Sequence, residues 1–250
     1  MMQEGVFMPR FFLSAEELGG TFAVLTGENA AHAKVLRLKS GDAVTLCDGH
    51  GMDFSGIISD VSPGQFSVVI QKAIPSPSEA ALRCMVYMAY AKQDKFEHVV
   101  QKATELGAAE IVAFPSTRCV SRPDAKSLIK KLERWQKIAA SAAEQSGRGC
   151  IPQVRAAASY ESAVKQAAAA DYPLFFYENE QTRTLHQVFE SAPTGTVSLM
   201  TGPEGGFTTE EVALAQQAGM AICSLGPRIL RCETAPLCAL TAVMYAGGQI

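Results

Sequence analysis

The sequence predicts an α/β protein with two parts, and three observations predict it. Residues 1–73 contain short runs of alternating apolar and polar residues, separated by turn signals, as in a small β-domain. Residues 74–79 hold two prolines among serines, which favours an extended linker. From residue 83 onward, apolar strand-like runs alternate with helical runs, as in a mainly parallel sheet covered by helices. We therefore expect a small N-terminal β-barrel over 1–73, a linker over 74–82 and an α/β domain over 83–250.

The N-terminal part is expected to be built from short strands joined by tight turns. The strands are expected at residues 22–26, 43–47, 54–59 and 66–71. Glycine, proline, serine and aspartate mark the turns between them, at 40–42, 48–49 and 62–64. Strands this short at this spacing favour a small barrel over one layer of a larger sheet.

The larger domain is expected to alternate strands and helices along its whole length. Strands are expected at 84–90, 111–114, 174–177, 197–201 and 221–225. Helices are expected at 94–106, 124–146, 161–170, 183–190 and 208–218, followed by a final helix from about residue 233. Gly107, Gly147 and Gly219 are expected to end three of them. The final helix is apolar on nearly all sides, which places it in a core or a subunit interface.

Two local patterns sharpen these helices. Thr208 and Glu211 have the spacing of a capping box at the start of the 208–218 helix. In the 124–146 helix, a buried stripe is expected from Leu128, Leu132, Trp135 and Ala139.

Composition narrows the class of protein. The chain has 250 residues, of which 48% are hydrophobic, which is ample for a packed core. The first twelve residues carry one basic residue and no long apolar stretch, unlike a secretory signal or transit peptide. The longest small and apolar run, at 235–248, falls short of the roughly 20 residues that cross a bilayer. We therefore expect a soluble, cytoplasmic protein without a membrane span.

The cysteines and histidines do not form a metal-binding pattern. Seven cysteines are scattered without a CxxC pair, and Cys47, Cys84 and Cys223 lie in apolar runs, as reduced core thiols do. The four histidines stand apart from one another and from the cysteines. We therefore expect no bound metal.

A basic span lies inside a chain whose net charge is −3. Between Arg83 and Arg155 there are thirteen Lys and Arg against seven Asp and Glu. Within this span lies a dense series of basic residues, among which Asp124 and Glu133 are the only acidic ones. The series comprises Arg118, Arg122, Lys126, Lys130, Lys131, Arg134 and Lys137. Such a series is either a solvated helix face or a contact for the phosphate backbone of a nucleic acid.

Two loops carry the chemistry. Each follows an apolar strand and leads into a helix: Thr201-Gly202-Pro203-Glu204-Gly205-Gly206-Phe207, and Leu225-Gly226-Pro227-Arg228-Ile229-Leu230-Arg231-Cys232-Glu233-Thr234-Ala235. In a parallel sheet both would emerge at the carboxyl edge, where open α/β sheets bind ligands. Each loop could also be only a tight turn, but charges in a crowded turn usually serve a site.

Known phosphate-binding patterns are missing from both loops. No Lys-Ser/Thr follows the second glycine as in a Walker motif, and the glycine spacing is not that of a dinucleotide fingerprint. What remains is a neutral or zwitterionic ligand read by main chain, with Leu225, Ile229 and Leu230 as apolar walls. An adenine ring and a methionine side chain fit that description.

The two loops together resemble the signature of the RsmE family, bacterial methyltransferases of small-subunit ribosomal RNA in the SPOUT superfamily. Other family-like segments run the length of the chain: Arg10-Phe11-Phe12, His32-Ala33-Lys34-Val35-Leu36-Arg37, Lys92, Gln101-Lys102-Ala103-Thr104-Glu105-Leu106-Gly107 and Ala143-Glu144-Gln145-Ser146-Gly147-Arg148. The resemblance implies a PUA-like N-terminal barrel, a SPOUT-type sheet with a C-terminal trefoil knot, and a homodimer whose interface holds the active site. Periodicity alone would give an unknotted sheet.

The resemblance also implies the reaction. It is methylation at N3 of a uridine in the decoding region of small-subunit (16S) ribosomal RNA, with S-adenosylmethionine as cofactor. The substrate is either naked RNA or the assembled subunit. Residues implied for the cofactor are Thr201, Gly202, Pro203, Glu204, Gly205, Gly206, Leu225, Gly226, Pro227, Ile229, Leu230 and Thr234. Cys232 stands where the family usually carries Thr, so a hydroxyl hydrogen bond there is lost or weakened.

Catalytic and RNA-binding candidates follow. N3 of uracil must lose a proton, and Arg231 is the candidate cation that stabilises the anion; the alternative is a structural pair with Glu233 or a helix C-terminus. Glu204 is a candidate general base, or it bonds backbone amides and holds its loop. The residues implied for RNA are Arg10, His32, Arg37, Lys92, Arg118, Arg122 and Arg148.

Two other classes of function compete with a methyltransferase. A non-catalytic RNA-binding or ribosome-assembly protein would keep the fold and bind RNA without the cofactor. A dinucleotide-dependent oxidoreductase is disfavoured, because the glycine fingerprint and the acidic residue that should follow it are missing.

Overall fold

The computed structural model describes residues 8–180, 183–189 and 192–250, and it divides into two compact units. The first unit comprises the residues up to Glu79 together with Ala143–Ile151, and the second comprises Ala80–Ala142 and Pro152–Ile250. The first seven residues of the chain, and residue 190 at the end of one expected helix, lie outside the described residues. Since Ala143–Ile151 is far in sequence from the rest of the first unit, no periodicity indicates that it belongs there.

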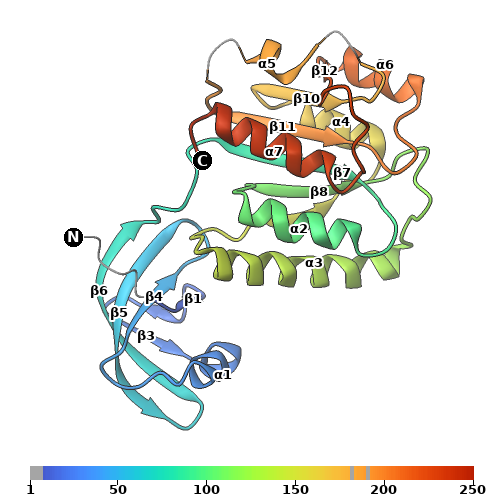
Figure 1. Ribbon diagram of the computed structural model, residues 1–250. Coiled ribbons are helices and arrows are strands. Elements are labelled where there is room, and N and C mark those ends of the chain that lie inside the picture. Colours follow the sequence, from blue (N-terminus) through green and yellow to red (C-terminus); the bar gives the residue numbers. More distant parts are fainter. Residues whose placement is uncertain (1–7, 181–182, 190–191) are drawn as a thin grey trace. The chain divides into compact units, whose positions relative to one another are not determined.

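The first unit contains one six-stranded sheet in the order β1-β4-β5-β6-β3-β2. Its strands are β1 (Arg10–Phe12), β2 (Leu18–Gly19), β3 (Phe22–Leu25), β4 (Ala43–Cys47), β5 (Met52–Ser62) and β6 (Gln65–Pro75). Neighbouring strands are antiparallel, except that β1 runs parallel to β4. The sheet curls (Figure 1), with β1 and β2 at its two ends. The expected small barrel therefore takes the form of a half-closed sheet.

Two features of this unit differ from the sequence expectation. Strands β5 and β6 have 11 residues each, and β6 continues through Ile74 and Pro75, where the linker was expected. The helix α1 (Gly27–Val35) was not expected. Its buried residues are Ala30 and Ala33, and alanine is too small to give an apolar period.

The second unit contains a six-stranded sheet in the order β12-β10-β11-β7-β8-β9, in which every pair of neighbours is parallel. The strands are β7 (Arg83–Ala89), β8 (Glu110–Phe114), β9 (Gln153–Ala156), β10 (Tyr172–Phe176), β11 (Thr196–Thr201) and β12 (Ala221–Cys223). The parallel sheet and its five expected strands are confirmed. Strand β9 was missed, because Val154 is its one fully buried residue.

Helices cover both faces of this sheet. They are α2 (Lys95–Glu105), α3 (Ala125–Ser146), α4 (Tyr160–Ala167), α5 (Leu185–Val188), α6 (Thr209–Gln217) and α7 (Ala235–Ala246). Helix α7 packs on β7 and β11 and against α2, whereas α4 packs on β7, β8 and β11 and against α6 (Figure 1). Gly107, Gly147 and Gly219 end their helices with φ of 91°, 74° and 90°, as expected. The expected helix at 183–190 is only the four residues of α5.

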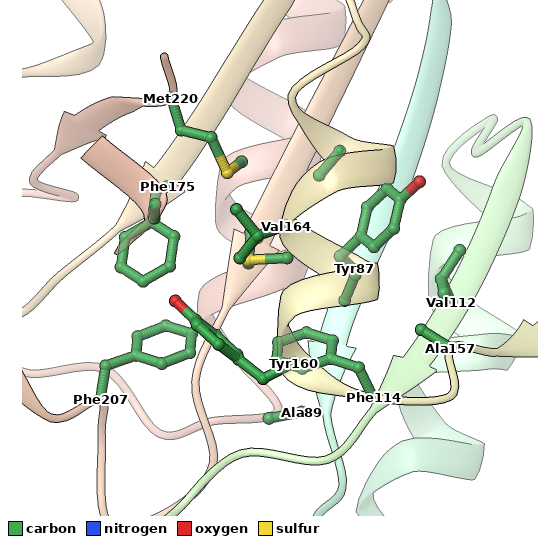
Figure 2. Close-up of a cluster of buried hydrophobic side chains, with 14 residues drawn as sticks. Tyr87, Ala89, Val112, Phe114, Ala157, Tyr160, Val164, Phe175, Phe207 and Met220 are labelled. Carbon is green, nitrogen blue, oxygen red and sulfur yellow. The ribbon is translucent and has the colours of Figure 1, made fainter. Parts of the chain in front are cut away.

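The core of the second unit reaches into the first of the two loops. Phe207 is 1% exposed, and its ring centroid lies 4.3 Å from that of Phe175. Figure 2 shows it among Tyr160, Phe175 and Phe114. In the described ranges, none of the helices has the length and apolarity that crossing a membrane requires. The core thus fixes one end of the first loop.

Candidate active site

The first loop follows β11, at the point where the order of the strands reverses, whereas the second loop follows β12 at the edge of the sheet, with β10 between the two strands. From β7 the chain continues to β8 and β9 on one side, while β11, the other neighbour of β7, belongs to the later half of the sheet. The loops that follow β7 and β11 therefore leave neighbouring strands at the same carboxyl edge. A crevice at such a switch point is where ligands bind in open parallel sheets.

The first loop, Gly202–Phe207, is held by close backbone contacts. A Cβ on Gly202 would lie 3.2 Å from the ring of Phe207. Gly206 has φ of 65° and donates its N–H to Pro203 O at 3.0 Å, and a Cβ there would lie 2.1 Å from Glu178 Oε1. Glycine is therefore favoured at both positions, at Gly206 by its left-handed φ and at Gly202 by the close approach of the Phe207 ring.

Glu204, between these glycines, is tied to the loop that follows β7. Its Oε1 accepts hydrogen bonds from the backbone N–H of Lys92 and from Lys95 Nζ, both at 3.0 Å. Burial opposes ionisation, but these bonds outweigh it and lower the pKa of Glu204. Gln93, in the same loop, has φ of 57°, a left-handed conformation rare outside glycine. The carboxylate is therefore ionised and committed to this loop.

Lys95 connects the two loops, and the sequence did not single it out. Besides Glu204, its Nζ lies 3.7 Å from Glu233 Oε2 in the second loop. Hydrogen bonding to Glu204 raises the pKa of Lys95, with the charge of Glu233 adding to it. A signal was present in the sequence: Lys95 is the first residue of α2, where a cation opposes the helix dipole. Such a cation is stabilised when carboxylates lie beside it, as Glu204 and Glu233 do here.

The second loop presents backbone N–H groups and one exposed apolar side chain to its surroundings. In the described part of the chain, the backbone N–H groups of Arg228, Ile229 and Leu230 donate no hydrogen bond. Ile229 is 86% exposed, and Gly226 has φ of 98° with open space beside its Cα. Unpaired amides beside an exposed apolar side chain fit the adenine-like ligand that the sequence predicts.

Arg231 is exposed at the end of this loop. Its carbonyl accepts the N–H groups of Thr234 and Ala235 at 2.9 Å and 3.0 Å, which fixes its backbone at the start of α7. Among the ion pairs of the described residues, Glu233 has Lys95 as its partner and Arg231 has none within 4.0 Å. The guanidinium of Arg231 is therefore available to a substrate.

Cys232 keeps a polar contact at the position where the resemblance leads one to expect Thr. Its thiol donates to Glu233 Oε2 at 3.2 Å, and Lys95 Nζ lies 3.9 Å from its sulfur. Burial raises the pKa of Cys232 to about 12, and the bond to Glu233 adds to this. The thiol thus stays protonated and serves as a weak donor.

The remaining cofactor candidates differ in exposure. Thr201 is 1% exposed, and its Oγ1 lies 3.4 Å from Tyr87 O. Pro203 is also buried, whereas Pro227 and Thr234 are exposed and Leu225 is half-buried. The exposed candidates thus come from both loops, since Glu204 and Gly205 of the first loop are exposed as well.

Two of the candidate RNA-binding arginines are used inside the first unit. Arg10 donates two hydrogen bonds to Asp53, at 2.7 Å and 2.8 Å, and its side chain is 14% exposed. Arg148 is 4% exposed, and its Nη2 donates to Glu79 Oε2 at 2.7 Å. Glu79 also accepts the N–H of Gly149 at 2.9 Å. The contacts of Arg148 and Gly149 with Glu79 hold the segment Ala143–Ile151 in the unit, and the two ion pairs leave neither guanidinium open to a phosphate.

The other RNA candidates lie on the surface. His32 is exposed and bonded through Nδ1 to Glu144 at 2.8 Å, and Arg37, with φ of 58°, is exposed at the end of α1. In the second unit Lys92 is exposed, and Arg118 donates to Gly205 O at 3.0 Å. Arg122 donates to the carbonyl of Ser116. Arg118 and Lys92 therefore border the first loop.

Within the described ranges, no group of three or more His, Cys, Asp or Glu could hold a metal ion. The charged side chains that the two loops and α2 bring to this edge include Arg231, Glu204, Lys95 and Glu233.

Both parts of the chain are similar to known RNA methyltransferases. Residues 78–244 match the model of an RNA methyltransferase domain, and residues 25–71 match that of an RNA methyltransferase PUA domain. The ribosomal RNA small subunit methyltransferase E of Bacillus subtilis is 35% identical over 249 residues, which is 95% of this chain and 96% of that protein.

Solved structures give the same picture. A methyltransferase from Legionella pneumophila in complex with bound SAM is 32% identical, with a TM-score of 0.84 over 96% of this chain and 98% of that one. The ribosomal RNA small subunit methyltransferase E of Neisseria gonorrhoeae, bound to S-adenosyl methionine, is 30% identical, with a TM-score of 0.81 over 95% and 97%.

Proposed function

The chain belongs to the family of the ribosomal RNA small subunit methyltransferases E, and from this premise we propose that it methylates N3 of a uridine in the decoding region of small-subunit ribosomal RNA. S-adenosylmethionine is the proposed methyl donor. The observation that carries the proposal is the meeting of the two loops at Lys95, which pairs with Glu204 of one and Glu233 of the other. The loops thereby form one site at the carboxyl edge.

The second loop fits the cofactor better than a phosphate ligand. Its unpaired amides at Arg228, Ile229 and Leu230 can hydrogen-bond the edge of an adenine, and the side chain of Ile229 can cover the ring. We assign the other contacts to Thr201, Gly202, Pro203, Glu204, Gly205, Gly206, Leu225, Gly226, Pro227 and Thr234. When bound, S-adenosylmethionine supplies an electrophilic methyl group on a sulfonium.

The protein's own task is to orient the uridine and help N3 lose its proton. Arg231 is the residue proposed to stabilise the resulting anion. At a separation of about 4 Å and an effective dielectric constant of about 20, one cation contributes about 4 kcal/mol, or about three pKa units. The guanidinium of Arg231 is exposed and forms no ion pair within 4.0 Å among the described residues, which supports this role, while its charge helps to lower the pKa of Glu233.

Glu204 is proposed to hold its loop rather than to act as the general base. A general base works best when its pKa lies near the operating pH. Oε1 of Glu204 already accepts from Lys92 and Lys95, and its lowered pKa reduces its affinity for a proton. Lys95 is then a positioning residue, acting through Glu204 and Glu233.

For RNA binding we propose His32 and Arg37 in the first unit, and Lys92 and Arg118 in the second. All four are exposed. Arg122 is proposed to support them through its bond to Ser116. Arg10 and Arg148 are proposed to be structural, since their ion pairs with Asp53 and Glu79 are largely buried.

The finer features of the family are also part of the proposal. We propose that the C-terminal part forms a trefoil knot and that the protein is a homodimer. Exposed Tyr245, at 75%, supports a partner surface on α7. We further propose that two domains separate within the stretch between β6 and β7, where the linker was expected, and that the enzyme acts on the assembled subunit in the cytoplasm.

Two measurements test the function. Calorimetry with S-adenosylmethionine should give saturable binding, and incubation with small subunits lacking the modification should transfer one methyl group, located by mass mapping. RNA binding without cofactor binding would favour a ribosome-assembly protein instead. Methylation at another base, or at another position of uridine, would contradict the proposed substrate atom.

A further inference from the structure

The proposed function does not use the exposed face of α3. Trp135 and Ala139 lie on the opposite, buried face of this helix and are 3% and 0% exposed. Lys126, Lys130 and Lys137 are all exposed. At 3.6 residues per turn they lie within about 40° of one another around the helix axis, nearly opposite Trp135. They form one stripe, which we name the α3 stripe.

The charge of the α3 stripe is largely uncompensated. Asp124 caps the helix by accepting the N–H of Ser127 at 2.8 Å, and Glu97 is paired with Arg134 at 2.6 Å. Among the described residues, none of the three lysines of the stripe has a carboxylate within 4.0 Å. Glu133 is the remaining acidic residue on this side of the helix. The α3 stripe is therefore positively charged, although the whole chain has a net charge of −3.

The spacing of the lysines favours an extended anion. With a rise of 1.5 Å per residue, Lys126 and Lys137 are about 16 Å apart along the axis, too far to surround one small anion. Point charges repeated along a ridge are suited to a phosphate backbone. Ile129, which is 61% exposed, borders the stripe and could instead contact a protein.

We propose that the α3 stripe binds the phosphate backbone of the ribosomal RNA substrate, away from the modified nucleotide. The inference rests on the proposed function for the identity of the RNA. Each lysine contributes a contact that depends on charge but carries no base specificity. The stripe therefore adds affinity and a salt dependence without entering the chemistry.

The test compares three variants with the wild type in binding to a full-length transcript of small-subunit ribosomal RNA over a range of salt. The triple variant K126Q/K130Q/K137Q should bind about tenfold or more weakly near 0.1 M salt, and its slope of log affinity against log salt should fall by about 3. Glu133→Gln should strengthen binding. Lys165→Gln, a control that removes an exposed lysine from α4, should change binding by less than twofold.

Urea unfolding and cofactor affinity confirm that the triple variant is folded. An unchanged slope and affinity in a folded triple variant would overturn the proposal. So would weakened binding to assembled subunits with unchanged binding to the transcript, because the stripe would then face an acidic protein surface. Methyl transfer is measured separately: its absence in the wild type refutes the proposed function, whereas the salt slopes still decide whether the stripe binds RNA.

Discussion

Lys95→Met removes a cation that pairs with both loops while keeping most of the side-chain volume. Its Nζ lies 3.0 Å from Glu204 Oε1 and 3.7 Å from Glu233 Oε2. In the variant these carboxylates keep their charges and lose the group between them. We expect the loops to separate and the cofactor site to open.

The size of the effect follows from the exposure of the three side chains, which is 24% for Lys95 and Glu204 and 23% for Glu233. A hydrogen bond between charged groups contributes about 1.5–3 kcal/mol, but partial exposure screens it. We therefore expect the free energy of unfolding to fall by about 1–2 kcal/mol. Since a displacement of about 1 Å can cost about 100-fold in rate, kcat/KM should fall by about 10- to 100-fold.

The assay combines calorimetry with S-adenosylmethionine, turnover on small subunits and urea unfolding. Lys95→Arg should recover much of the cofactor affinity, because it restores the charge. Lys102→Met is the matched control: it lies on the same helix and pairs with Glu105, at 2.8 Å, and not with either loop among the described residues, so it should leave cofactor affinity unchanged. Cofactor affinity within about threefold and near-normal turnover in Lys95→Met would refute the bridging role.

Three further outcomes are expected. Arg231→Ala should leave cofactor affinity within a few fold yet lower turnover by at least about 100-fold, for loss of a cation worth about 4 kcal/mol; near-normal turnover would show the assignment to be wrong. Gly206→Ala should lower the free energy of unfolding by about 1–2 kcal/mol, because φ is 65° at this position. Replacing Glu178 as well should recover little of this loss, since its flexible carboxylate can move away. An unchanged urea midpoint would contradict the prediction. Burial opposes ionisation of Glu79, but its bonds to Arg148 and to neighbouring amides lower its pKa below the ordinary 4.5. The stabilisation from this ion pair should therefore be complete above pH 4.5, and it should be lost as the pH falls through the lower pKa that Glu79 has in the folded protein. Glu79→Gln should cost about 2–4 kcal/mol at neutral pH and flatten that decline, and equal acid sensitivity of both proteins in urea titrations would exclude the pair as its cause.

Elements whose pattern is local were predictable. The strands and helices of the second unit repeat apolar residues at their own period, and the glycine stops at 107, 147 and 219 need only a left-handed φ at one position. Helix α1 and strand β9 were missed because small or few buried side chains carry them. The open end of the barrel was missed because sheet closure depends on pairings between distant strands.

The sequence by itself determined the alternating α/β pattern, the two loops and, through their motifs, the family. Each of these features is formed by residues that are contiguous in the chain, so it can be recognised without the three-dimensional structure. The tertiary structure decided which charges meet. Lys95 and Glu204 are 109 residues apart, and Arg10 and Arg148 look like surface arginines until Asp53 and Glu79 are placed beside them. The sequence does not distinguish a paired charged residue from a free one, because the folded order of the strands, and not the neighbours in the chain, decides which residue becomes its partner.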